Sequence, residues 1–172
     1  MLSSARVCLL VFVMGWTKVD CGFVNDYDKD ARLECLTNSI LSYIGSIHEN
    51  KYEDRIWEFA CRPAPDTISG CYWTNYLNQF DKPLDYKCRG NEVLNGMMSY
   101  HDNRCEDRRF MVQCGRVANR STRNCYQTFY VNDLDGVMTF SVPTGQVIKG
   151  VYSYHENKKE DRRWRFYLCD LA

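Results

Sequence analysis

The chain has 172 residues, with 22 Lys and Arg, 22 Asp and Glu, and ten Cys. That length suits one domain with a real hydrophobic core, which disulfides would supplement. The net charge of zero argues against a general nucleic-acid-binding protein, and 14% aromatic with 26% charged residues excludes global disorder.

The N-terminus has the pattern of a secretory signal peptide. Arg6 precedes the apolar run 7–14, and a basic residue followed by about 7–15 apolar residues is typical of an export signal. Cleavage after Cys21 leaves eight Cys, which suits four disulfides, whereas the alternative cleavage after Gly15 leaves nine. We predict a signal peptide at 1–21 and a secreted, extracellular chain at 22–172.

One block of sequence occurs three times, at residues 46–61, 99–114 and 153–169. Each copy has Ser-x-His, a short polar stretch, and Asp-Arg followed by large apolar residues. A fainter block at 23–28, 76–81 and 130–135 keeps the same offsets of 53 and 54 residues. A shared period indicates copies of one structural unit. We predict a single domain of three repeats, at 22–70, 71–124 and 125–172.

Each repeat has the pattern of β structure. Trp57 and Phe59 share one face at period two, as Trp164 and Phe166 do, and residues 147–152 follow a turn signal at 143–145. The polar stretch between His and Asp-Arg predicts a hairpin loop. We expect an all-β, disulfide-stapled, pseudo-threefold closed assembly, trefoil-like or prism-like, because closure removes exposed sheet edges.

The spacing of the Cys residues restricts their pairing. Two pairs of Cys are 26 residues apart, and two other pairs are 43 and 44 residues apart. Cys114 belongs to one pair of each kind. We predict the disulfides Cys35–Cys61 and Cys125–Cys169. The remaining four Cys pair in one of two ways, either Cys88–Cys114 with Cys71–Cys105 or Cys71–Cys114 with Cys88–Cys105.

The Asp-Arg part of the block has a structural interpretation. Neighbours along a strand point to opposite faces, so Asp54 and Arg55 are not expected to face the core together. We expect the Arg side chains to bond carboxylates or carbonyls across the joins between repeats. The structural set is Asp54, Arg55, Trp57, Asp107, Arg108, Asp161, Arg162 and Trp164.

The polar loops have a binding interpretation. We expect them to be exposed and to form three equivalent weak sites for sugars or acidic groups, whose combined attachment would be strong. The alternative is that each His bonds only within its own turn. The candidate ligand-binding residues are His48, Asn50, His101, Asn103, His155, Asn157, Lys158 and Arg163.

Catalytic and metal motifs are absent from the sequence. No Gly-x-Ser-x-Gly, zinc box or phosphate loop occurs, so we predict no enzyme, no cofactor and no metal site. Asn119 in Asn-Arg-Ser is a glycosylation candidate. Residues 22–103 carry a net charge of −5 and 104–172 one of +4, which favours self-association or attraction to sulfated glycans or lipopolysaccharide.

The repeated hexapeptide resembles a known family. Asp-Arg-x-Trp-x-Phe at 54–59 and 161–166, with Gly-Phe-Val-Asn at 22–25, is similar to the motifs of dermatopontins. The resemblance covers nearly the whole mature chain and is nearest to the invertebrate hemagglutinin/amebocyte aggregation factors. Phe110 and Val112 depart from the motif in the middle copy, where we expect looser packing.

The resemblance implies a secreted, non-enzymatic, lectin-like agglutinin. Such a protein would aggregate blood cells in innate defence by multivalent binding to cell-surface glycans or glycoproteins. The alternative that the family implies is an extracellular-matrix protein that binds collagen and proteoglycans. Neither reading includes a nucleic-acid partner.

Overall fold

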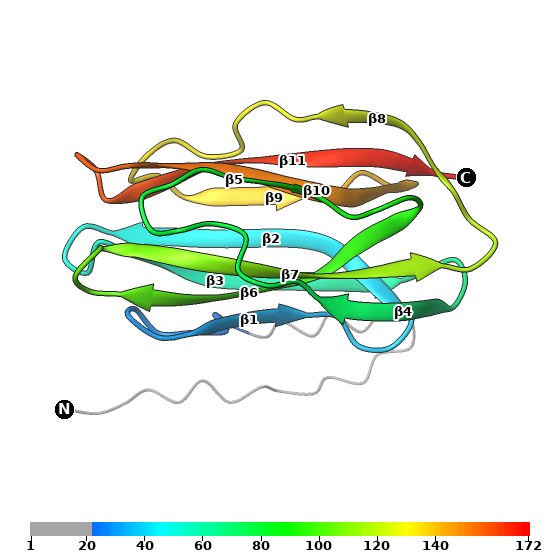
Figure 1. Cartoon of the computed structure of the whole chain (residues 1–172), viewed down its shortest axis with the longest axis horizontal. Coiled ribbons are helices and arrows are strands. Elements are labelled where there is room, and N and C mark those ends of the chain that lie inside the picture. Colours follow the sequence, from blue (N-terminus) through cyan, green and yellow to red (C-terminus); the bar gives the residue numbers. More distant parts are fainter. Residues whose placement is uncertain (1–21) are drawn as a thin grey trace, which may run out of the picture.

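A computed structural model describes residues 22–172, so the predicted signal peptide lies outside the described residues (Figure 1). The described residues contain strands and no helix, and the all-β prediction is confirmed. No helix that could span a membrane is found among them. The strands are β1 (Ala31–Glu34), β2 (Ser39–Glu49), β3 (Asp54–Pro63), β4 (Ile68–Trp73), β5 (Leu84–Lys87), β6 (Glu92–Asp102), β7 (Asp107–Val117), β8 (Thr122–Gln127), β9 (Met138–Ser141), β10 (Gln146–Glu156) and β11 (Asp161–Leu171).

Three long antiparallel hairpins form the frame: β2–β3, β6–β7 and β10–β11. Each carries a register shift at the same place in its first strand, where an extra residue increases the local twist. The last residue of each hairpin turn has a positive φ, namely Glu53 (45°), Glu106 (44°) and Glu160 (42°). That backbone region is costly for a residue other than Gly, so the turn geometry is imposed by its surroundings.

Strand exchange links the three hairpins in a cycle. The short strand β1 pairs with β6 of the next hairpin, β5 pairs with β10, and β9 returns to pair with β2. Gly96 and Gly150 allow the close approach, since a Cβ there would contact the carbonyl oxygens of Leu33 and Tyr86. A strand of the third repeat therefore completes the sheet formed by the first hairpin. This cyclic pairing is the arrangement that a closed assembly of three repeats requires.

The hydrophobic core lies between the hairpins. Trp57, Phe110 and Trp164 come from equivalent positions and meet edge to face, with ring centroids 4.9–6.2 Å apart. All three are at most 1% exposed, and Val112 is fully buried. The expectation of looser packing in the middle repeat is therefore wrong, because Phe110 fills its place between the two Trp rings.

Three disulfides staple the sheets. Cys35–Cys61 and Cys125–Cys169 form as the spacing indicates, and Cys88–Cys114 is the third. The expectation of a fourth bridge is wrong, since Cys71 and Cys105 are unpaired. Cys105 lies in the turn between β6 and β7, whereas Cys71 lies beside Gly115 of β7. Gly115 lies eight residues along β7 from that turn, a distance of roughly 26 Å. Cys71 and Cys105 are therefore too far apart to form a disulfide with each other.

The register explains why Cys71 has no partner. Val147 pairs with Cys169 in the third hairpin, and Val93 pairs with Gly115 in the second. Gly115 thus holds the position of Cys169, just as Cys71 holds that of Cys125. A Cβ added at Gly115 would lie 2.7 Å from Cys71 Sγ. The second repeat therefore lacks one Cys of a bridge that the third repeat keeps.

Replacing Gly115 by Cys is expected to restore this bridge. The variant should have one accessible thiol fewer than the native chain and a free energy of unfolding higher by about 2 kcal/mol, within the usual disulfide range. Thiol titration of the denatured protein and urea unfolding measure these quantities. Gly115→Ser is the control, because it adds a side chain of similar size that crowds Ile68 but cannot form a disulfide. An additional free thiol with lower stability would contradict the register argument.

Candidate functional site

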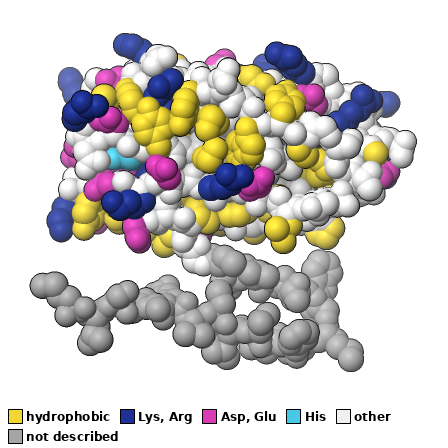
Figure 2. Space-filling view, turned by 60° about the horizontal axis from the view of Figure 1, so that its bottom comes forward, with side chains coloured by type: hydrophobic (Ala, Val, Ile, Leu, Met, Phe, Trp, Pro, Cys, Tyr) yellow, Lys and Arg dark blue, Asp and Glu magenta, His cyan; other side chains and the backbone are white. Residues whose placement is uncertain are grey.

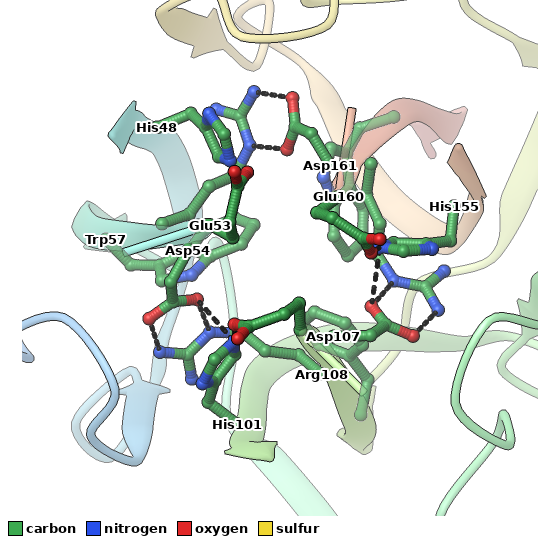
Figure 3. A pocket seen from close by; sticks show the side chains of 15 residues that line it. His48, Glu53, Asp54, Trp57, His101, Asp107, Arg108, His155, Glu160 and Asp161 are labelled. Atoms are coloured by element: carbon green, nitrogen blue, oxygen red, sulfur yellow. Dashed lines mark hydrogen bonds and ion pairs between the residues drawn. The ribbon is translucent and has the colours of Figure 1, made fainter. Parts of the chain in front are cut away.

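Three buried ion pairs join the repeats in a ring (Figure 3). In each pair, the Arg donates from Nε and Nη2 to both oxygens of the Asp, at 2.6–2.7 Å. All six residues are 3% exposed. Two-point pairing of this kind fixes distance and orientation together. The pairs are Arg108–Asp54, Arg162–Asp107 and Arg55–Asp161.

Asp54 and Arg55 are both buried, although neighbours along a strand point to opposite faces. The reason is that they meet different repeats: Asp54 accepts from Arg108 of the second, whereas Arg55 donates to Asp161 of the third. Asp54 also accepts the backbone N–H of Asp28 at 2.9 Å. Both faces of the strand end are therefore covered by protein.

The three His side chains are buried next to this ring. Their side chains are 0–1% exposed, so the prediction that the His side chains are exposed together with the loops is wrong. The strands β2, β6 and β10 continue past each His, so the imidazole faces the neighbouring repeat. His101 Nδ1 lies 3.5 Å from Asp28 Oδ1, and His155 Nδ1 lies 3.6 Å from Asp81 Oδ1. His48 Nδ1 lies 3.9 Å from Asp135 Oδ1.

Three Glu residues border the pocket at the centre of the ring: Glu53 and Glu160, which are labelled in Figure 3, and Glu106. Burial raises the pKa values of Glu106 and Glu160, although the adjacent His partly offsets this, and surrounding carboxylates add to it. The free volume at the centre is about 20 Å³, enough for a water molecule or a small ion. A small area of His surface is visible among acidic and basic side chains (Figure 2).

Sequence reasoning missed these Glu residues as part of the site. They belong to the repeated Glu-Asp-Arg triplet, and that recurrence was the available signal. It could not show that the three copies converge, because convergence depends on how the repeats pack.

The exposed part of the predicted site is confined to the hairpin turns. Asn50, Asn103, Asn157 and Lys158 are exposed there, and the three turns lie at one end of the molecule, at the left of Figure 1. Arg163 lies elsewhere, on β11, where its guanidinium packs 4.2 Å from the Tyr130 ring centroid. The predicted ligand-binding set is thus divided among a buried ring, an exposed end and a side face.

The comparisons with known proteins identify the family of the chain. Residues 25–172 match the family model for dermatopontin. The chain belongs to the dermatopontin family. It is 44% identical over 151 residues to the hemagglutinin/amebocyte aggregation factor of Limulus polyphemus, which covers 87% of each chain.

Two other relatives support the same assignment. A dermatopontin of Biomphalaria glabrata is 41% identical over 136 residues, covering 79% of this chain and 91% of the relative. Millepora cytotoxin-1 of Millepora dichotoma is 36% identical over 146 residues, covering 85% of this chain and 65% of the relative. No solved structure matches. The predicted resemblance to dermatopontins is therefore confirmed.

Breaking one ion pair should destabilise the whole domain. Arg108→Met leaves Asp54 as a buried charge without its partner, and we expect a loss of about 3–5 kcal/mol in the free energy of unfolding. Adding Asp54→Asn should recover part of that loss, because the uncompensated charge is removed. Urea unfolding measures both.

The matched control is Arg104→Met. The Arg104 side chain is 89% exposed and pairs with Asp102, so its loss should change the free energy of unfolding by less than about 1 kcal/mol. Equal effects of the Arg104 and Arg108 substitutions would show that the ring does not hold the repeats together.

Proposed function

We propose that the protein is a secreted, non-enzymatic agglutinin that aggregates cells by multivalent binding to cell-surface glycans or glycoproteins. The observation that carries the proposal is the presence of three equivalent exposed turns at one end of a rigid ring. The similarity to a protein named hemagglutinin/amebocyte aggregation factor supports an adhesive role. Secretion is supported by the three disulfides, which form in oxidising compartments.

Each turn presents the same chemistry to solvent. An exposed Asn is followed by an exposed basic residue, in the pairs Asn50–Lys51, Asn103–Arg104 and Asn157–Lys158. The amide both donates and accepts hydrogen bonds, as sugar hydroxyls require, and the cation attracts carboxylate or sulfate groups. One such turn offers few contacts and would bind weakly. Three turns held at fixed spacing would bind one surface far more strongly.

Bridging two cells requires a further step, because all three turns share one end of the molecule. Self-association is therefore part of the proposal. The N-terminal part of the mature chain is acidic and the C-terminal part is basic, which favours contact between two copies. An associated pair whose turn-bearing ends point apart would contact two cells at once.

Removing the three Asn side chains should weaken aggregation strongly. For the triple variant Asn50→Ala, Asn103→Ala, Asn157→Ala we expect the minimal aggregating concentration to rise at least about tenfold, and far less for any single change, because avidity is shared. The assay is aggregation of washed cells, with competing sugars and heparin to identify the ligand class. Asn75→Ala is the matched control, since Asn75 is exposed and lies outside the turns.

Two outcomes would contradict the proposal. Aggregation by the triple variant at the native concentration would exclude the turns as adhesive sites. Aggregation by a protein that light scattering shows to be monomeric would exclude bridging by self-association. Binding to collagen or proteoglycan without any aggregation would instead favour the extracellular-matrix alternative.

A further inference from the structure

Three clusters of one His and two Asp repeat around the ring. In each, one ligand atom per residue lies within 4.8 Å of the other two. Two ligands bound about 2.1 Å from one ion lie at most about 4.2 Å apart, so modest side-chain rotation would bring each cluster to metal-binding geometry. The clusters are His101 with Asp28 and Asp54, His155 with Asp81 and Asp107, and His48 with Asp135 and Asp161.

Several polar atoms of these clusters lack a hydrogen bond within residues 22–172, although His101 Nδ1 lies 3.3 Å from Asn103 Oδ1 of its own turn. His48 and His155 make no hydrogen bond at either ring nitrogen, and His101 makes none at Nε2. Oδ1 of Asp28, Asp81 and Asp135 is also buried without a hydrogen bond. Buried polar atoms are nearly always satisfied by protein, water or an ion. Here unsatisfied imidazole and carboxylate atoms from adjacent repeats face the same spaces.

The local negative charge also favours the binding of a cation. Around His101 lie the carboxylates of Asp28, Asp54 and Glu106, opposed by the one guanidinium of Arg108. Around His155 lie Asp81, Asp107 and Glu160, opposed by Arg162. Each cluster therefore carries an excess of two negative charges when its His is neutral. The Asp28, Asp81, Glu106 and Glu160 side chains are 27–35% exposed, so solvent screens part of this charge, and a bound cation would compensate the part that is buried.

We propose that the His101 and His155 clusters each bind one divalent cation that accepts both imidazole and carboxylate ligands, such as Mn²⁺ or Zn²⁺. Asp54 keeps about one free lone pair for this role, on Oδ1, because its two oxygens offer about four acceptor positions and accept three hydrogen bonds, of which two go to Oδ2. Each ion would contact side chains of two neighbouring repeats. Cation binding would thus strengthen the same joins as the Arg–Asp ring.

The third cluster differs in one residue. Lys159 Nζ lies 2.6 Å from Asp135 Oδ2, which places a positive charge on one of the proposed ligands of the His48 cluster. The equivalent positions in the other repeats are Tyr52 and Cys105, neither of which carries a fixed positive charge. We therefore expect two tight sites in the native protein and a weak third one.

The test is titration of the secreted protein with Mn²⁺ at pH 7.5, with free Mn²⁺ followed by electron paramagnetic resonance. We expect two equivalents to bind and the melting temperature to rise by about 5 °C or more at saturation. Asp28→Asn and Asp81→Asn should each remove one equivalent. These changes suit the backbone, since Asp28 and Asp81 have φ near 60° and Asn tolerates that region. Lys159→Gln should raise the number of bound Mn²⁺ equivalents to three, because it removes the positive charge beside Asp135.

Asp133→Asn is the matched control. Its side chain is 91% exposed and lies two residues from Asp135, so it should leave both the stoichiometry and the melting temperature unchanged. Absence of saturable binding would overturn the proposal, and so would two equivalents that persist in the double variant Asp28→Asn, Asp81→Asn. The titration does not depend on cell aggregation, so its failure is distinct from failure of the proposed function.

Discussion

The ring of three Arg–Asp pairs is the constraint on which the rest of the structure depends. Six charged side chains are removed from water there, and each is compensated by a residue from another repeat. A buried pair that loses one member leaves an uncompensated charge at high cost. The three joins must therefore close together. The exchange of β1, β5 and β9 does the same for the backbone, so side chains and strands both enforce one cyclic arrangement.

Closure also accounts for the strained and unsatisfied features at the turn-bearing end. Glu53, Glu106 and Glu160 adopt positive φ, immediately before the Asp residues that enter the ring. Such a backbone is kept when the surrounding contacts over-determine it. The same packing buries each His among carboxylates of the preceding repeat. The polar centre is therefore a consequence of joining the repeats, and the chemistry proposed for it uses residues already held in place.

Much of the fold could be predicted because the signal lies within one repeat. The spacing of Asp-Arg, the alternation at Trp57 and Phe59, and the Cys35–Cys61 interval are local patterns that survive in any packing of the units. The burial of His101 could not be predicted in this way. Its polar neighbours in sequence favour an exposed loop, whereas Asp28 and Asp54, which enclose it, come from another repeat. The same limitation applies to Cys71, because only the pairing of β6 with β7 shows that Gly115 lies where the third repeat has Cys169.

Rigidity at the ring supports the adhesive role that we propose for the exposed turns. A flexible set of three turns would lose conformational entropy on binding, and each additional contact would strengthen attachment less. Here the turns emerge directly from strands whose ends are fixed by buried ion pairs, so their spacing is set before any ligand is met. Multivalent attachment gains most when several sites match a surface without rearrangement. In the proposed function, the buried charges thus fix the positions of the exposed Asn residues, which would make the contacts with the ligand.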